Sequence, residues 1–294
     1  MKFDFICAQA AKKAFPVAFM CRMLEVSSSG FYAWRSRPVS ARAAGDATLG
    51  RLITTIFDAH QGRYGVRRIF AELTKTGHRV SYKRVQRLMV ELGLRSVHPR
   101  PYKRTTLRGE AAAHLVDLVL RNVTPAGPNA TWVGDVTYIK TWTGWAYLAT
   151  VIDCHSRKIV GWSVADHMRT DLVVDALDMA LKNRRPPPGV IFHSDRGSQY
   201  TSQQFRDFCT DHDVRPSVGK TGICYDNAVS ESFFATIKKE LVHLRPWPSL
   251  SRLRTALFHY IETYYNRKRR HSTLDYLTPQ EYEREFDSKG LQAA

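Results

Sequence analysis

The sequence predicts an α/β fold in which a mixed sheet follows an all-α region. Between residues 48 and 95, apolar side chains recur at the three- and four-residue spacing of helices. From Asn129 the pattern changes to three successive runs rich in β-branched and aromatic residues, which are typical of strands. Amphipathic segments then alternate with short apolar runs, and this order is typical of helices that cover a sheet.

Near the start of the chain, residues 17–37 predict a helix, a serine-rich turn and a second short helix that Ser27–Ser29 can cap. The aromatic side chains Phe31, Tyr32 and Trp34 are interpreted as a small core, with a base-stacking surface as the alternative. Residues 37–46 are expected to form a linker.

A helix is expected over residues 48–60, followed by two short helices. Gly77 is predicted to end the first of these and Ser81 to cap the second. Their outer faces are basic, so a helix-turn-helix that lies in a DNA groove is favoured over a helical hairpin with a solvated face. The side chains expected to contact DNA here are Arg67, Arg68, Lys83, Arg84 and Arg87.

The net charge of +17 is unevenly distributed. Residues 60–108 hold 13 basic and 2 acidic side chains, whereas residues 126–240 hold 13 of each. Such a basic block predicts a polyanionic partner, because lysine and arginine release counterions when they neutralise phosphates. Charge alone also suits a ribosomal protein or an RNA-binding enzyme.

Composition narrows the class of protein further. The five cysteines are scattered without a CxxC pair, which indicates reduced thiols rather than a zinc site. No run of 18 apolar residues occurs, and the first residues lack the apolar block of a signal peptide, so a cytoplasmic protein without membrane contact is expected.

The middle of the chain predicts the order β-β-β-α-β-α-β-α. Four units are expected: residues 1–45 as a small helical segment, 46–108 as the basic helix-turn-helix and linker, 126–245 as the α/β core, and 246–294 as a C-terminal helix and basic tail. The last long helix of the core is expected to be capped by Asp226 or Asn227.

Three acids in the core are the candidate catalytic residues. Asp135 lies within an apolar and aromatic strand, Asp195 ends another apolar strand, and Glu231 lies in the first turns of a helix. Each acid taken alone is more readily explained by a salt bridge or a turn cap. Asp153, which also ends a strand, is interpreted as a structural acid paired with Arg157.

The combination of the three acids indicates metal chemistry. Two strand carboxylates and one helix carboxylate can surround a pair of Mg²⁺ ions, which prefer hard oxygen ligands to cysteine or histidine. Such ions activate a water or a 3′-hydroxyl and neutralise charge on the phosphate. The prediction is therefore DNA strand transfer without a covalent protein–DNA intermediate.

Motifs along essentially the whole chain resemble one known family. They are MCRMLEVSSSGFYAWRSRP, RYGVRRIFAEL with SYKRVQRLMVELGL, WVGDVTYI, HSDRGSQYTS, CYDNAVSESFFATIKKEL and YYNRKRRHSTLDYLTPQEYE. The chain resembles the second-frame product of IS3-family insertion sequences, a transposase with a catalytic core of the retroviral-integrase type. Thirty-five residues separate Asp195 from Glu231, which is the D-D-35-E spacing of that superfamily, and no catalytic position departs from it.

The resemblance implies an RNase H-like core in which Asp135, Asp195 and Glu231 bind Mg²⁺ or Mn²⁺, as two ions. It also implies 3′-end cleavage at terminal inverted repeats of double-stranded DNA and joining of that end to a target. Lys238, seven residues after Glu231 and on the same helix face, matches a basic residue thought to contact DNA near the cleaved end.

The resemblance further implies partners. In similar elements, ribosomal frameshifting joins this frame to an upstream helix-turn-helix and zipper product. The main end-recognition and dimerisation modules are then expected on that product, with the helix-turn-helix of this chain as an accessory contact. A homo-oligomer on nucleoid DNA is expected.

Further side chains beside these motifs are candidates for a DNA surface. Arg196 and Gln199 are expected to touch DNA, and Tyr200 either does so or packs on the following helix. His193 is either a group that orients a metal ligand or a plain polar residue at a strand end. A last basic cluster is read as a phosphate clamp rather than a solvated helix end: Arg267, Lys268, Arg269, Arg270 and His271.

Three alternatives to a transposase remain open. A retroviral-type integrase needs an N-terminal His/Cys zinc module, yet residues 1–60 contain a single histidine, His60, and no paired cysteines. A nuclease of the same fold that cuts RNA–DNA hybrids fits the acids but not the basic helix-turn-helix. A non-catalytic DNA-binding regulator, with structural acids, would show no Mg²⁺-dependent cleavage.

Overall fold

The structure is a computed structural model of the chain, and it describes residues 2–12, 15–97, 125, 127–218 and 228–293. Two predictions fall outside these residues. They are the basic linker after residue 97 and the cap at Asp226 or Asn227. Among the described residues, no helix is long and apolar enough to cross a membrane.

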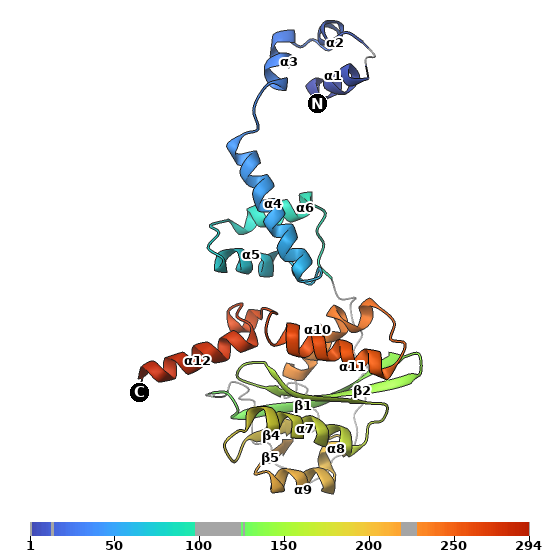
Figure 1. The fold of residues 1–294 in the computed structure, drawn as a ribbon, viewed down its shortest axis with the longest axis vertical. Helices are drawn as coiled ribbons and strands as arrows, with labels where there is room; N and C mark the ends of the chain where they lie inside the picture. The colour runs from blue at the N-terminus through green and yellow to red at the C-terminus, as the bar shows by residue number, and fades with distance from the viewer. Residues whose placement is uncertain (1, 13–14, 98–124, 126, 219–227, 294) are drawn as a thin grey trace.

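Three short helices form a small unit at the N-terminal end, on the far side of helix α4 from the sheet (Figure 1). Ser27 caps the third helix by accepting a hydrogen bond from the Gly30 backbone N–H, as predicted. Phe31 is fully buried and Trp34 packs against it, whereas Tyr32 is exposed. The unit comprises α1 (Lys2–Ala11), α2 (Val17–Met23) and α3 (Ser28–Arg35).

The next three helices are α4 (Ala41–Ala59), α5 (Val66–Lys75) and α6 (Tyr82–Glu91). The linker expected over residues 37–46 is in part wrong, because Ser40 caps α4 and an alanine-rich stretch extends this helix toward the N-terminus. Gly77 has φ +84° just beyond α5, and Ser81 accepts from the Arg84 N–H at the start of α6. The predicted ends of the helix-turn-helix are therefore confirmed.

A five-stranded sheet forms the rest of the core, with strand order β3-β2-β1-β4-β5. The first three strands pair antiparallel, while β4 pairs parallel to β1 and β5 parallel to β4. This mixed sheet is the predicted arrangement and is RNase H-like. The strands are β1 (Thr131–Thr141), β2 (Gly144–Asp153), β3 (Ile159–Ala165), β4 (Ile191–Ser194) and β5 (Arg215–Val218).

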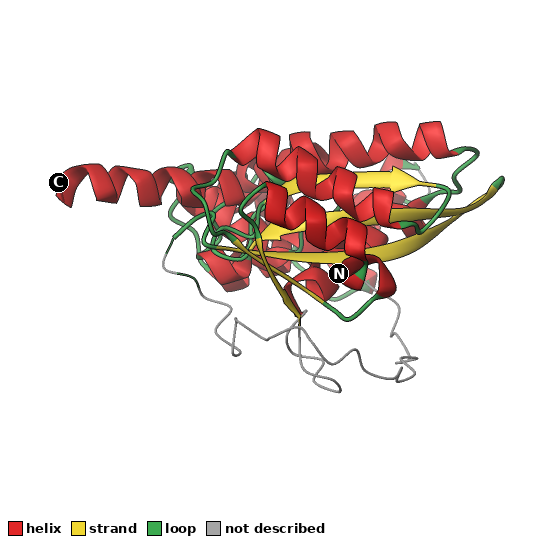
Figure 2. Ribbon diagram, turned by 90° about the horizontal axis from the view of Figure 1, so that it is seen from below, coloured by secondary structure: helices red, strands yellow, loops and turns green. Residues whose placement is uncertain are grey.

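Helices cover both faces of the sheet (Figures 1 and 2). One face packs on α7 (Thr170–Arg184), with α8 (Ser198–Thr201) and α9 (Gln203–Asp211) beside it. The other face packs on α10 (Ala228–Glu240) and α11 (Leu250–Phe258). Side chains alternate between these faces along β1, so Val133 joins the α10 side and Trp132 the α7 side.

Asp153 is a structural acid as expected, but among the described residues its carboxylate is bound by backbone amides and not by the Arg157 side chain. Its carboxylate is fully buried and accepts hydrogen bonds from the backbone N–H groups of Asn129, His155 and Ser156, at 2.7, 3.0 and 2.9 Å. Three amide donors satisfy the buried charge. Asp153 is therefore part of the turn between β2 and β3.

The close approach of β3 to α7 depends on Gly161. A Cβ atom at this position would lie 2.1 Å from the carbonyl oxygen of Ala176 and 2.7 Å from the backbone nitrogen of Ala180. We expect Gly161→Ala to lower the free energy of unfolding by roughly 1–3 kcal/mol or more, because backbone must shift. Urea denaturation measures this loss.

Gly50→Ala, in α4, is the matched control for Gly161→Ala. A Cβ there meets only Leu92, at an ordinary 3.5 Å, so the change should leave stability equal or higher. Equal losses in the two variants would contradict the assigned packing of β3 on α7.

The C-terminal part returns to the helix-turn-helix region. After α11 the chain continues through a π-helical segment, His259–Tyr265, and ends in α12 (Pro279–Ala293), which extends beyond the sheet (Figure 2). The Tyr64 hydroxyl donates to the Lys268 carbonyl at 2.9 Å. One continuous apolar cluster joins α4–α6 to α10 and α11, so the two regions share a core.

Buried ion pairs reinforce this junction. Glu240, at the end of α10, accepts from Arg269 at 2.8 Å and from the Tyr260 hydroxyl at 2.8 Å, and lies 3.5 Å from Arg68. Burial alone would raise the pKa of Glu240, but Arg269 and then Arg68 hold this pKa below its usual value. Arg270 pairs with Glu72 of α5.

The prediction that residues 267–271 form a phosphate clamp is wrong for Arg269 and Arg270. Arg269 and Arg270 are 5% and 6% exposed and bind acids within the protein. Arg267 and Lys268 are exposed. Because a buried charge needs a partner, the two buried arginines join the helix-turn-helix region to the core rather than face a ligand.

Candidate active site

The parallel pairing of β1 with β4 brings two of the candidate acids to the same level of the sheet. Val133 pairs with His193 in register, and Asp135 and Asp195 each follow two residues later. Residues two apart share a face, and Val133 faces α10. The two aspartates therefore emerge side by side, where β4 ends, toward the helix that carries Glu231.

Asp135 has the most perturbed environment of the three acids. Its side chain is partly buried, and its Oδ1 atom accepts from the Val136 N–H at 2.7 Å. The pKa of Asp135 is raised to about 7, first by burial and next by the charge of Asp195, with a smaller contribution from Glu231. Strongly shifted carboxyl groups of this kind cluster at functional sites.

Asp195 and Glu231 are exposed to solvent. The Gly197 N–H donates to Asp195 Oδ1 at 3.0 Å, which orients that carboxylate just beyond the strand end. Glu231 lies in the first turn of α10, where the helix dipole favours an acid. Thus a mid-strand residue, a strand-end residue and a helix residue supply the three acids.

Lys238 lies two turns after Glu231 on the same side of α10. It lowers the pKa of Asp135, so its positive charge acts on the acids. Its Nζ atom is 5.3 Å from the ring centroid of Tyr138, an exposed residue of β1. Tyr138 in turn contacts the exposed Trp145 edge-on. A basic and aromatic surface therefore adjoins the acids.

Asp195 and Glu231 both act electrostatically on Asp135. Among the described residues, no group of three His, Cys, Asp or Glu side chains converges closely enough to hold a metal. The donor set nevertheless fits a hard divalent cation, since it consists of carboxylate oxygens. Their mutual repulsion adds to burial in raising the pKa of Asp135. A cation between them would relieve that repulsion.

The neighbours of Asp195 divide between packing and surface. Tyr200 is buried against Phe192 and Phe205, so it packs on the following helix rather than facing DNA. Gln199 donates to the Met168 carbonyl at 3.0 Å, and Arg196 is half-buried. His193 is buried 2.9 Å from Ser217 Oγ on β5, a polar contact between the ends of neighbouring strands.

The basic residues of the helix-turn-helix also divide into two groups. Arg67 and Lys83 are exposed. Arg84 and Arg87 both pair with Asp46 of α4, each at 2.6 Å, and Arg68 points to Glu240. Three of the five residues expected to contact DNA therefore form ion pairs within the protein. Of the five, only Arg67 and Lys83 are exposed and have no ion pair among the described contacts.

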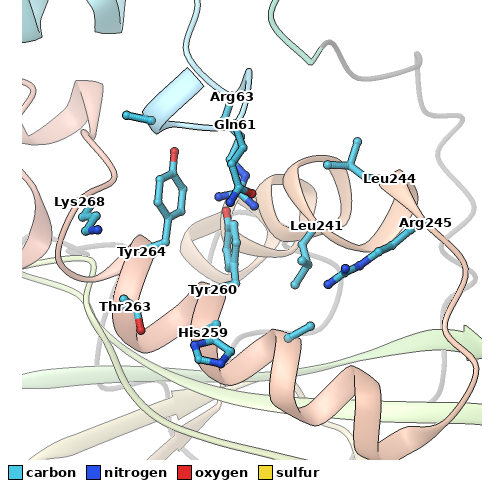
Figure 3. A pocket seen from close by; sticks show the side chains of 12 residues that line it. Gln61, Arg63, Leu241, Leu244, Arg245, His259, Tyr260, Thr263, Tyr264 and Lys268 are labelled. Carbon is cyan, nitrogen blue, oxygen red and sulfur yellow. The ribbon is translucent and has the colours of Figure 1, made fainter. Parts of the chain in front are cut away.

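Sequence reasoning missed Glu240 and Arg63. The apolar positions Phe233 and Ile237 continue to Glu240 at helical spacing, so an acid in a core stripe was the signal that could have revealed it. Arg63 donates to the Glu240 carbonyl at 3.1 Å and lines a cleft between α4 and α10 (Figure 3). No sequence pattern marks that cleft.

Comparison with known families matches the two halves of this architecture. An HTH-like domain matches residues 44–102, and two integrase core domain families match residues 125–224 and 212–279. The first integrase segment contains Asp135 and Asp195, and the second contains Glu231. The α/β region therefore matches an integrase core, and the helical region before it matches an HTH-like domain.

Solved structures that resemble the chain include two retroviral integrase catalytic cores. The HTLV-2 integrase core with magnesium is 22% identical, with a TM-score of 0.41, and the match covers 54% of this chain and 98% of that one. The BIV integrase core is 17% identical, with a TM-score of 0.42, over 55% of this chain and 99% of that one.

Relatives of known sequence match over nearly the full length. Transposase InsF for insertion sequence IS3A from Escherichia coli K12 is 38% identical over 285 residues, covering 96% of this chain and 98% of the relative. An IS600 insertion-element protein of 31 kDa from Shigella sonnei is 36% identical, covering 91% and 98%. The chain therefore belongs to the IS3 family of insertion-sequence transposases, with an integrase core and an HTH-like domain.

Proposed function

We propose that Asp135, Asp195 and Glu231 are the catalytic carboxylates of this transposase and bind two Mg²⁺ or Mn²⁺ ions. The reaction is 3′-end cleavage at the terminal inverted repeats of its element and joining of that end to target DNA. The observation that carries the proposal is the position of Asp135 and Asp195 at the same level of the paired strands β1 and β4, on the side of α10 and Glu231. Burial and then Asp195 raise the pKa of Asp135 there. Two acids held together in this way are costly unless a cation is used.

The residues of the chain have distinct roles in this proposal. When bound, the metal ions supply an activated water or 3′-hydroxyl and neutralise charge on the scissile phosphate. The Val136 and Gly197 N–H groups orient the carboxylates of Asp135 and Asp195. Lys238 binds the DNA backbone beside the reacting phosphate, and Tyr138 offers a ring on which an unpaired base can stack.

Further DNA contacts are proposed for three basic residues, two of them exposed and one half-buried. They are Arg67 and Lys83 of the helix-turn-helix, with Arg196 beside Asp195. Arg68, Arg84, Arg87, Arg269 and Arg270 are left out because acids of the protein bind them. In this proposal residues 46–108 direct the DNA and residues 126–245 perform the chemistry.

Partners and location complete the proposal. We propose that the enzyme acts as a homo-oligomer on nucleoid DNA in the cytoplasm. An upstream-frame product, fused by frameshifting, supplies the main recognition of the element ends. The HTH-like domain of this chain supports an accessory contact with DNA.

The test is incubation of the chain with duplex DNA that carries the ends of its element, with and without Mg²⁺. We expect metal-dependent nicking that leaves a 3′-hydroxyl at the element end, and mapping of that end measures it. DNA with scrambled ends is the control. Binding without any metal-dependent nick would instead indicate a regulator, and cleavage of RNA–DNA hybrids alone would indicate a nuclease.

A further inference from the structure

A cleft of about 470 Å³ lies at the junction of the helix-turn-helix region with α10 and α11 (Figure 3). The turn after α4, the end of α10 and the π-helical segment after α11 form its walls. None of the three catalytic carboxylates lines it. It is therefore a separate feature of the surface, built where the two regions meet.

The charge of the cleft has one sign. Arg63, Arg245 and Lys268 line it, whereas no aspartate or glutamate is among its described lining residues. Arg245 and Lys268 are exposed, so their charges face solvent. Clefts lined by one sign of charge concentrate counter-ions of the opposite sign. The ligand that fits this cleft is an anion.

Arg63 is held in place at the cleft. Its Nε atom donates to the Glu240 carbonyl at 3.1 Å, and its guanidinium lies 4.4 Å from the ring centroid of Tyr264 and 5.2 Å from that of Tyr260. Stacking on two rings fixes the planar group at little entropic cost. A fixed cation is typical of a binding site rather than of a solvated surface.

The Tyr264 hydroxyl is a second, independent sign of a ligand. Tyr264 is 8% exposed, and no described residue forms a hydrogen bond with its hydroxyl. Figure 3 shows this hydroxyl in the cleft, pointing toward the turn after α4 and flanked by Lys268 and Arg63. Burial raises the pKa of Tyr264, so the group stays a donor. A buried donor beside cations suits an oxygen of an anion.

The cleft lies along the helix that carries Glu231. Leu241, in the cleft wall, follows Glu231 by ten residues, which is about 15 Å of helical rise. Duplex DNA advances about 3.4 Å for each phosphate of a strand, so this distance corresponds to roughly four or five base pairs. A duplex that ran along α10 with its end at the acids would therefore reach the cleft with its backbone four or five base pairs from that end.

We propose that the cleft binds a phosphate of the DNA backbone, about four or five base pairs from the reacting end. Arg245, Lys268 and the Tyr264 hydroxyl contact its oxygens. The inference rests on the proposed function only for the position of the DNA end. Free inorganic phosphate offers the same oxygens, and the experiment below separates the two sources.

The experiment measures DNA binding by the full chain in EDTA, where no cleavage takes place, by fluorescence anisotropy over a range of salt concentrations. The variants are Arg245→Gln with Lys268→Gln, and Tyr264→Phe. We expect the double variant to weaken binding and to reduce the slope of log affinity against log salt by about one for each lost phosphate contact. Tyr264→Phe should weaken binding about tenfold, since it removes a hydrogen bond to a charged group.

The matched control is Lys182→Gln on α7, the helix that packs on the other face of the sheet from α10 and α11. The Lys182 side chain is 74% exposed. It should leave the salt slope unchanged. Thermal melting of each variant separates loss of binding from loss of structure. Tyr264→Phe should leave the melting temperature unchanged if the hydroxyl forms a hydrogen bond only with DNA. Variants that bind like Lys182→Gln would overturn the proposal.

A second series uses duplexes in which one backbone phosphate at a time, along the first turn, is a neutral methylphosphonate. The wild-type chain should lose affinity at the fourth or fifth position, and the double variant should not. Stabilisation of the wild type by inorganic phosphate, with no position-dependent loss on DNA, would assign the cleft to a small anion and refute the proposal. Binding in EDTA is independent of cleavage, so failure of the catalytic proposal would appear separately.

Discussion

Asp195→Asn is expected to abolish strand cleavage and joining while DNA binding survives, and Asp135→Asn and Glu231→Gln should do the same. Loss of a group that only orients a metal ligand already lowers metal affinity or activity about 10–100-fold. Loss of a ligand itself should therefore cost at least about 10³-fold. The measurement is the yield of 3′-hydroxyl product from end-containing DNA with saturating Mg²⁺, beside binding of the same DNA measured by gel shift.

The fold should survive these substitutions. The pKa of Asp135 is raised to about 7 by burial and then by the charge of Asp195, so the ionised form is unfavourable in the folded chain. A neutral asparagine is expected to leave the melting temperature equal or higher. Asp207→Asn, an exposed acid of α9, is the matched control and should keep full activity. Full activity in a variant of the three acids would remove that residue from the site.

Glu240→Ala is expected to lower the free energy of unfolding by about 3–5 kcal/mol, the cost of leaving buried charges without their partner. Arg269 is 5% exposed and would lose the carboxylate of Glu240 as its partner. Arg68 would also lose its contact with Glu240. Urea denaturation at pH 7 measures the change. The pKa of Glu240 is lowered, so its ion pairs contribute fully at this pH and are lost only as pH falls through that pKa.

Glu91→Ala provides the comparison for Glu240→Ala. Glu91 pairs with Arg87 on the surface of α6, where its side chain is 53% exposed, and such pairs contribute up to about 1 kcal/mol. Similar losses in the two variants would contradict the role given to Glu240 at the junction. Because Glu240 joins the helix-turn-helix region to the core, its loss should also loosen the position of bound DNA relative to the acids.

The order of elements and the acids followed from local patterns in the sequence. Strands β1 to β3 were predicted because β-branched and aromatic residues fit a half-buried pleated surface. Ser27, Gly77 and Ser81 marked helix ends because capping depends on a few neighbouring backbone groups. The spacing of Asp195 and Glu231 was sufficient to name candidate acids. That Asp195 lies beside Asp135 and adds to burial in raising its pKa became clear only from the pairing of β1 with β4.

The direction of each basic side chain was decided only by the tertiary structure. Counting charges marks residues 60–108 as basic, but it does not distinguish Arg67, which faces solvent, from Arg68, which reaches Glu240 across the junction. The partners of Arg269 and Arg270 lie 29 and 198 residues away in the chain. Ion pairs of this kind depend on which helices meet, and so does the cleft that Arg63 and Tyr264 line.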